Sequence, residues 1–366
     1  AMYDLVVIGE GAGGLRAAAA AVGVGAKVAL IEKRPPAGGG VVASKVVSRA
    51  VRSLRQVREA GRLGIDTGAV TADFAKIMSR AREVAGAVAA RDAERLARTP
   101  GVDLFQGTAS FESYDTVAID GGRQVVGRRF VIATGSRPSV PNIKGFKELG
   151  CLDAATVWNL NKAPKSLVVL GAGPVGLELA QAFARLGSKV TVVADSPGVL
   201  PGEDPDAATM VERAMAAEGV TFKLETTPSA VERRGDQKAV IYKKATGGAK
   251  GEALAAEVVA TSGRLANVEG LNLDALGVHG DAEHGVVVDD CLQTDAPRIY
   301  AIGDVLLRQG YANAAEHEAD VVVDNAVLRR RRKINYDALA RVAFLDPEFA
   351  AVGMTQAQAD AAARPH

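Results

Sequence analysis

The feature that most constrains the fold is a strand, turn, helix and second strand within residues 3–32. An apolar run from Leu5 to Ile8 is typical of a buried strand, and a Gly-Glu-Gly-Ala-Gly-Gly turn follows it directly. An Ala-rich helix comes next, and a second apolar strand, residues 28–31, ends at Glu32. This spacing predicts a βαβ unit that binds a dinucleotide.

Each glycine of this turn has a distinct expected role. Gly9 permits the tight turn, Gly11 lets the backbone approach a pyrophosphate, and Gly14 lets the helix pack closely on the strand. Free N–H groups at the helix N-terminus would face the phosphates, and Glu32 would accept hydrogen bonds from a ribose. A glycine-rich loop that binds nothing is the alternative, and the spacing of strand, helix and acid disfavours it.

The same unit occurs a second time. An apolar run, residues 167–170, is followed by Gly171-Ala172-Gly173-Pro174-Val175-Gly176, an amphipathic helix to Leu186 and a strand over residues 189–193. Two dinucleotide sites in one chain imply two cofactors, with electrons passing between them.

Composition excludes several classes of protein. The chain has 366 residues, enough for two or three domains, and its net charge of +1 and 4% aromatic content argue against a nucleic-acid partner. Charged residues interrupt the best candidate membrane span, so we expect no membrane partner. The two cysteines, Cys151 and Cys291, form no metal-ligand pattern, so we expect no metal site and a cytoplasmic location.

The remaining segments give a coarse secondary structure. Apolar spacing predicts a helix over residues 46–57 and a long helix from Phe74 to the break at Pro100. Residues 104–119 indicate a β-meander, and buried strands are expected near residues 130–133, 258–260 and 298–302. The basic run 329–333 is interpreted as a solvated connection rather than a nucleic-acid site.

Four motifs in order, GEGAGG, IATGSRP, GAGPVGLE and YAIGD, resemble the class I flavin-dependent pyridine nucleotide-disulfide oxidoreductases. The dihydrolipoamide dehydrogenase and mercuric reductase branch is the most similar. The resemblance implies an α/β fold, glutathione reductase-like, with two Rossmann-like domains that bind FAD and NAD(P). It implies a discontinuous FAD domain, residues 1–140 and 266–330, an inserted NAD(P) domain, residues 141–265, and the start of a truncated interface (dimerisation) domain, residues 331–366.

The resemblance also implies site residues. Lys45 would lie beside the flavin and pair with Glu178, because in this family a Lys after the active-site cysteines pairs with a Glu after the second glycine motif. A cation there would stabilise the charge that develops as hydride arrives. Without the resemblance, Lys45 would be read as a helix start and Glu178 as a cap. The candidate cofactor-binding residues are Gly9, Gly11, Gly13, Gly14, Glu32, Lys33, Thr134, Gly135, Ser136, Arg137, Gly171, Gly173, Val175, Gly176, Asp195, Gly263, Gly303 and Asp304.

The sequence departs from the family at the reactive centre. The family carries two cysteines in a GG-x-C-x4-C-x-P-S-K segment, whereas residues 38–45 here contain none, are shorter, and have Ala43 in place of the proline. Without thiols the disulfide half of the family's cycle cannot run, but the hydride half needs only the two nucleotide sites. Most of the interface domain is also missing, so we expect a weak homodimer or an alternative interface.

The nicotinamide preference depends on the end of the second unit's last strand. Ala194 occupies the position that matches Glu32, and Asp195 follows it. An acid at this point favours the unmodified ribose of NAD(H) over the 2′-phosphate of NADP(H), so NAD is favoured.

The sequence therefore predicts an FAD-dependent NAD(P)H oxidoreductase that transfers hydride from nicotinamide to flavin and passes electrons to an unidentified small molecule. One alternative is a mercuric reductase or dihydrolipoamide dehydrogenase-type disulfide reductase whose cysteine segment is missing from this sequence. Another is a non-catalytic FAD- and NAD-binding protein.

Overall fold

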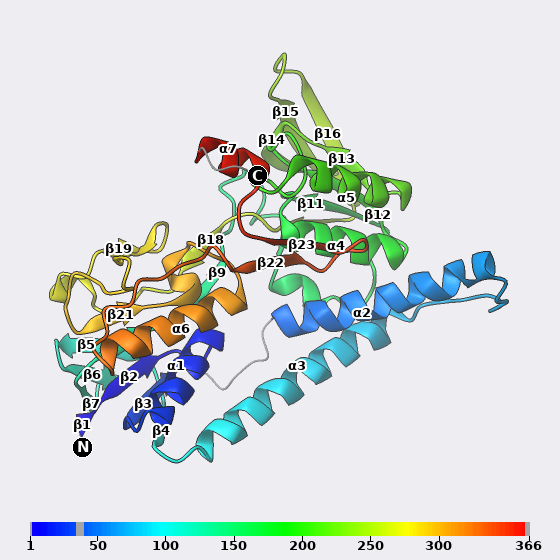
Figure 1. The fold of residues 1–366 in the computed structure, drawn as a ribbon. Helices are drawn as coiled ribbons and strands as arrows, with labels where there is room; N and C mark the ends of the chain where they lie inside the picture. Colours follow the sequence, from blue (N-terminus) through cyan, green and yellow to red (C-terminus); the bar gives the residue numbers. More distant parts are fainter. Residues whose placement is uncertain (1, 34–39, 363–366) are drawn as a thin grey trace. The chain divides into compact units, whose positions relative to one another are not determined.

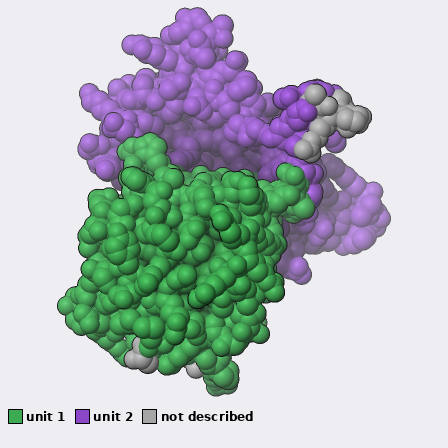
Figure 2. All heavy atoms as spheres, turned by 60° about the vertical axis from the view of Figure 1, so that its left-hand side comes forward, with its two compact units in different colours: residues 1–37, 88–137, 264–340 green, residues 38–87, 138–263, 341–366 purple. Residues whose placement is uncertain are grey.

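The computed structural model describes residues 2–33 and 40–362, and its chain divides into two compact units (Figures 1 and 2). Unit 1 comprises residues 1–37, 88–137 and 264–340, and unit 2 comprises residues 38–87, 138–263 and 341–366. The division falls within the long helix α3, Phe74–Ala97. In the part of the chain that the structure describes, no helix is both apolar enough and long enough to cross a membrane.

Unit 1 contains a five-stranded parallel sheet that begins with the first dinucleotide-binding unit. Its strand order is β21-β8-β2-β3-β4, with Val7 beside both Leu30 and Val131. All four residues of β2 are buried, because both faces of the sheet are covered. The strands are β2 (Leu5–Ile8), β3 (Val28–Glu32), β4 (Val102–Gln106), β8 (Phe130–Ile132) and β21 (Ile299–Ala301).

Two helices of unit 1 pack against each other on this sheet. Helix α1, Ala12–Gly23, lies along helix α6, Ala312–Ala326 (Figure 1). A second sheet has the order β1-β7-β6-β5, in which only β1 and β7 are parallel. Its strands are β1 (Met2–Tyr3), β5 (Ala109–Ser113), β6 (Thr116–Ile119) and β7 (Arg123–Gly127), and the short strands β18 (Arg264–Ala266), β19 (Gly280–Asp281) and β20 (Gly285–Val286) complete the unit.

The expected meander over residues 104–119 is wrong in its first part. Residues 102–106 form β4, which pairs in parallel with β3, Leu30 lying beside Leu104. The antiparallel strands begin only at Ala109. A short apolar segment fits a meander and a parallel edge strand equally well, so local pattern could not decide between them.

Unit 2 is built on a second five-stranded parallel sheet, of order β10-β17-β11-β12-β13, which contains the second dinucleotide-binding unit. Alternate residues of β11 face opposite sides: Leu167 and Val169 pack in one apolar cluster, and Val168 and Leu170 in another. The strands are β10 (Leu152–Asp153), β11 (Ser166–Leu170), β12 (Lys189–Val193), β13 (Thr221–Lys223) and β17 (Glu257–Ala260).

Helices cover one face of this sheet and a three-stranded antiparallel sheet covers the other. On the helical face, α2 packs against α4, and its apolar residues Val47 and Val51 are buried there. The other helices and strands of unit 2 are α2 (Gly40–Glu59), α4 (Pro174–Arg185), α5 (Pro205–Ala217), β14 (Thr226–Arg234), β15 (Gln237–Lys244), β16 (Lys250–Ala255), the pair β22 (Ala340–Ala343) and β23 (Phe349–Val352), and α7 (Gln356–Ala361). Strand β9 (Ser136–Pro138) pairs with β18 of unit 1. The helix predicted over residues 46–57 lies within α2.

Candidate functional site

The first glycine-rich turn has the geometry that a dinucleotide site requires. Gly9 has φ +109°, and a Cβ there would lie 2.3 Å from the Ala133 carbonyl oxygen. A Cβ on Gly14 would lie 1.9 Å from the Gly9 oxygen, so only glycine lets α1 approach the turn this closely. A Cβ on Gly11, by contrast, would meet nothing within 4 Å, so the space beside Gly11 is open to a ligand.

The N-terminus of α1 is left uncapped. Gly11 is the N-cap residue, makes no side-chain cap, and no acidic residue follows in the first turn. The free N–H groups therefore suit a phosphate. Gly13 is buried against α6, where an added Cβ would lie 3.1 Å from the Ala315 oxygen, so its main role is helix packing.

Two carboxylates lie at the end of β3 and in the first turn. The Glu10 backbone N–H donates to Glu32 Oε2 at 2.8 Å. Glu10 Oε1 is buried and has no hydrogen-bond partner. Burial raises the pKa of the Glu10 carboxyl, and the charges of Glu32 and Asp92 raise it further. The predicted ribose acceptor, Glu32, is thus half-buried beside a second acid that the motif did not indicate, and Lys33 beyond it is exposed.

The turn after β8 is joined to the segment after Arg264. Thr134 Oγ1 donates to the Asn267 carbonyl at 2.7 Å, and Gly135 has φ +69° with open space around its Cα. Arg137 pairs with the Glu269 carboxylate, and the hydrogen bonds that Arg137 donates lower the pKa of that carboxyl. Because the guanidinium of Arg137 is engaged by Glu269, this residue supports the turn.

Asp304 is held by two partners. Ser136 Oγ donates to Asp304 Oδ2 at 3.1 Å, and Arg264 Nη2 lies 3.3 Å from the same oxygen. Arg264 Nε also donates to Ser136 Oγ at 2.7 Å. The three side chains form one polar cluster in unit 1, and Arg264 is a member that no motif indicated.

Gly303 is fixed by a buried carboxylate. Its N–H donates to Glu318 Oε2 at 2.5 Å, and Tyr336 Oη donates to Glu318 Oε1 at 2.6 Å. Glu318 is only 1% exposed, and burial raises the pKa of its carboxyl. Glu318 was also missed from the sequence, since it lies among the apolar residues of α6 without a recognisable pattern.

The second glycine-rich turn repeats the first. Gly171 has φ +113°, a Cβ on Gly176 would lie 2.3 Å from the Gly171 oxygen, and Gly173 has nothing within 4 Å. Gly173 is the N-cap residue of α4 and makes no side-chain hydrogen bond to the helix, and Pro174 follows at the first helical position. The exposed Val175, at 47%, lies beside this open N-terminus.

Two further residues predicted to bind a cofactor, Asp195 and Gly263, also belong to unit 2. Asp195 lies two residues beyond the end of β12 and is exposed. Gly263 has φ +83°, and its carbonyl accepts a hydrogen bond from the Ser139 N–H at 3.1 Å. The Asp195 carboxylate is thus exposed, whereas the Glu10 and Glu32 carboxylates of the first site are half-buried.

Lys45 of α2 and Glu178 of α4 form an ion pair, as the resemblance led us to expect. Lys45 Nζ lies 3.1 Å from Glu178 Oε1 and 3.0 Å from Oε2. The side chain of Glu178 is 11% exposed and that of Lys45 is 35% exposed. Phe344 contacts both: its N–H donates to Glu178 Oε1 at 2.9 Å, and its ring centroid lies 3.7 Å from Lys45 Nζ. No motif had indicated Phe344 as a site residue.

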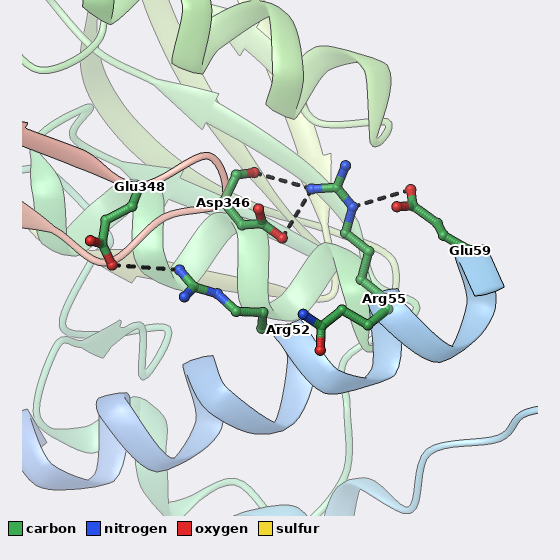
Figure 3. A pocket seen from close by; sticks show the side chains of 6 residues that line it. Arg52, Arg55, Glu59, Asp346 and Glu348 are labelled. Atoms are coloured by element: carbon green, nitrogen blue, oxygen red, sulfur yellow. Dashed lines mark hydrogen bonds and ion pairs between the residues drawn. The ribbon is translucent and has the colours of Figure 1, made fainter. Parts of the chain in front are cut away.

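A polar cavity of about 410 Å³ lies between α2 and the segment 346–348 (Figure 3). Arg52 faces Glu348, and Arg55 lies between Glu59 and Asp346. Each of these arginines is paired with a carboxylate. The residues that line the cavity therefore form an ion-pair network that joins two segments of unit 2.

The two cysteines, Cys151 and Cys291, are both free and form no disulfide. Burial raises the pKa of the Cys151 thiol, the opposite of what a reactive thiolate needs. No group of three or more metal-ligating side chains is present among residues 2–33 and 40–362. Residues 34–39, which include the glycines that precede Lys45, lie outside the described part.

Comparisons with known proteins agree with this geometry. The model of the family "Pyridine nucleotide-disulphide oxidoreductase" matches residues 3–319. A mercuric reductase from Lysinibacillus sphaericus is 32% identical over 361 residues, which cover 98% of this chain but 66% of that protein, so the chain spans just under two thirds of its length. A dihydrolipoyl dehydrogenase from Geobacillus stearothermophilus is 32% identical over 97% of this chain and 76% of its own.

A solved structure is also similar over nearly the whole chain. The HOCl-induced flavoprotein disulfide reductase RclA from Escherichia coli, in its Cu(II) complex, superposes with a TM-score of 0.84 and 25% identity, covering 99% of this chain and 79% of that one. The predicted α/β fold with two Rossmann-like domains is confirmed. The chain belongs to the pyridine nucleotide-disulfide oxidoreductase family, whose members are FAD-dependent oxidoreductases.

Proposed function

We propose that this chain is an FAD-containing, NAD(P)H-dependent oxidoreductase that carries out the hydride-transfer half of the family's reaction. The observation that supports this most is the duplicated glycine geometry. In each turn the last glycine packs so closely on the first that a side chain cannot fit, at Gly14 and Gly176, and the middle glycine is left open, at Gly11 and Gly173. Two open turns, each at an uncapped helix N-terminus, suit two dinucleotides.

The residues of unit 1 fit FAD. Gly9, Gly11 and the α1 N-terminus would hold the pyrophosphate, and Glu32 would accept hydrogen bonds from the adenosine ribose. Asp304, held by Ser136 and Arg264, would accept from the ribityl chain. The bound flavin supplies hydride acceptance and onward electron transfer, which no side chain offers.

The residues of unit 2 fit the nicotinamide dinucleotide. Gly173 and the α4 N-terminus would hold its pyrophosphate. Asp195 supports NAD over NADP, because an exposed carboxylate accepts hydrogen bonds from a ribose and repels a 2′-phosphate. Lys45 would present its ammonium to the charge that develops during transfer, and Glu178 would hold the ammonium in place.

The electron acceptor would be a small molecule such as oxygen, a quinone or a dye. This follows from the absence of cysteine in the sequence between Gly38 and Lys45, where the family's disulfide would lie. The relatives' names keep a disulfide reductase as the alternative, for a natural protein that contains the missing segment.

Three further assignments concern the oligomeric state, nucleic acid as a partner, and the location in the cell. Members of the family form homodimers, and exposed apolar residues in the C-terminal segment, Phe344, Val352 and Met354, support a weak homodimer here. The basic run is paired with acids, Arg330 and Arg332 with Asp324, which supports no nucleic-acid partner. The free, sparse cysteines support a cytoplasmic location.

The test is turnover of NADH with a dye acceptor by FAD-loaded protein. We expect Lys45→Ala and Glu178→Gln to lower kcat on the order of 100-fold without loss of FAD. The matched control is Lys238→Ala, which breaks another Lys–Glu pair of unit 2, between the buried Lys238 and the half-buried Glu257, and should leave kcat unchanged. FAD-loaded protein that does not oxidise NADH would contradict the proposal and favour a non-catalytic binding protein.

A further inference from the structure

Phe344 contacts both members of the Lys45–Glu178 pair, and it does so through different groups. Its ring covers the ammonium, with 3.7 Å between the ring centroid and Lys45 Nζ. Its backbone N–H donates to Glu178 Oε1 at 2.9 Å. The ring attracts the cation through its quadrupole, and the N–H fills a lone pair of the carboxylate that also accepts from Lys45. The ion pair therefore has a third member.

The backbone on the C-terminal side of Phe344 is fixed to α4 and α2. The Asp346 N–H donates to Gln181 Oε1 at 2.9 Å, and the Asp346 carbonyl accepts from Gln181 Nε2 at 2.8 Å. Arg52 donates to the Leu345 carbonyl at 2.8 Å. Ala343 and Leu345, on either side of Phe344, are 0% and 1% exposed. The Phe344 N–H thus has little freedom to move away from Glu178.

The Asp346 side chain adds a second anchor, seen from close by in Figure 3. Its Oδ2 lies 3.0 Å from Arg55 Nη1 and 2.9 Å from Arg185 Nη2. Glu218 forms ion pairs with both of these arginines, so no guanidinium is left with Asp346 alone. The side chain of Arg185 is 6% exposed and those of Arg55 and Asp346 are about a third exposed, so the network is partly buried, and each of its cations has at least two carboxylate partners that restrain it.

We propose that Phe344 is a positioning residue for hydride transfer, held by the Asp346 anchor and acting through Lys45 and Glu178. This inference rests on the proposed function. Lys45 is 35% exposed and has a flexible stem, so the ion pair alone restrains its ammonium in one direction only. The Phe344 ring restrains it from a second direction and excludes water from one side.

The test compares Phe344→Leu with Phe344→Tyr. Leucine keeps the backbone N–H and the apolar bulk but loses the ring face, whereas tyrosine keeps the face. We expect Phe344→Leu to lower kcat for NADH oxidation about tenfold, with little change in KM or FAD content, since a partly desolvated cation–π contact is worth about this factor. Phe344→Tyr should restore kcat. Phe349→Leu, the same change at a buried position of β23, is the control and should leave kcat unchanged.

A second readout does not need turnover. In FAD-free protein, reductive methylation of Lys45, measured by mass spectrometry of its peptide, should be several-fold faster in Phe344→Leu than in the wild type or in Phe349→Leu. An unchanged methylation rate would overturn the inference whatever the turnover. Faster methylation with wild-type kcat would overturn the catalytic role and leave the proposed function standing. Absence of turnover in the wild type would overturn the proposed function and this inference together.

Discussion

The two glycine-rich turns have the same backbone and different surroundings. In both, the first glycine has a positive φ, and the sixth residue of the motif packs against the first, Gly14 against Gly9 and Gly176 against Gly171. The first turn, however, contains a half-buried pair of acids, Glu10 and Glu32, whereas the second has Ala172 and an exposed Asp195. The shared part is set by steric contact and serves any dinucleotide. We expect the part that differs to decide which dinucleotide each turn prefers, and how the stability of each turn depends on pH.

The largest effect is expected where the two turns are the same. Gly14→Ala and Gly176→Ala each place a Cβ against a backbone oxygen, at 1.9 Å and 2.3 Å, which cannot be relieved by a side-chain movement. We expect each to destabilise its unit by about 3 kcal/mol or more. Thermal unfolding of FAD-free protein measures this. Gly86→Ala, in α3 with nothing within 4 Å of its added Cβ, is the control and should be neutral or slightly stabilising. Equal stability of all three variants would contradict the steric account.

The open glycines should separate the two sites. A Cβ at Gly11 or Gly173 meets no protein atom within 4 Å, so the stability should change by less than about 1 kcal/mol. The Cβ does intrude where a pyrophosphate would lie. We expect Gly11→Ala to weaken FAD binding, and Gly173→Ala to raise the KM for NADH, each on the order of tenfold. Each variant serves as the control for the other. An effect of Gly11→Ala on NADH alone would contradict the assignment of cofactors to turns.

Substitution of Asp195 should have a smaller effect, on the preference between NADH and NADPH rather than on nucleotide binding as such. Asp195→Asn removes one exposed charge, so the ratio of kcat/KM for NADH to that for NADPH should fall roughly fivefold, the scale of about 1 kcal/mol. Steady-state kinetics with both nucleotides gives the ratio. An unchanged ratio would show that Asp195 does not face the adenosine ribose.

The smallest expected effect is a pH dependence of stability that arises from Glu10 in the first turn. The raised pKa of Glu10 means that the native state binds this proton more tightly than the unfolded state, whose carboxyl titrates near 4.5. The free energy of unfolding should therefore fall as pH rises above 4.5, until the native carboxyl is also ionised. Glu10→Gln should show a smaller decrease, because the buried carboxyl of Glu318, whose pKa is also raised, still contributes its own. Urea unfolding of FAD-free wild type and variant at several pH values tests it, and parallel curves would contradict it.

Local pattern predicted the parts of this molecule that depend on neighbours in sequence. The strands, the helices and the distinct roles of Gly9, Gly11 and Gly14 follow from a spacing of a few residues, and the contacts around each glycine have the predicted form. The Lys45–Glu178 pair spans 133 residues and was reached only through the resemblance. Its geometry agrees with that expectation, although its role in transfer stays a prediction.

The contacts that were missed join distant segments without a repeating pattern. Arg264 meets Ser136 across 128 residues, and Phe344 meets Glu178 across 166. Such contacts depend on how strands and helices pack, which periodicity does not encode. The parallel edge strand β4 was missed for the same reason, since its partner is β3 rather than the strand that follows it.

The central claim is that hydride chemistry at the flavin proceeds in this chain without a redox disulfide. An anaerobic reductive titration of the FAD-loaded protein, counting electrons taken up per bound flavin, tests it most directly. The sequence has no cysteine between Gly38 and Lys45, and Cys151 and Cys291 are both free, so the account predicts uptake of about two electrons. Uptake of about four would mean that a second two-electron centre is present, and would contradict it.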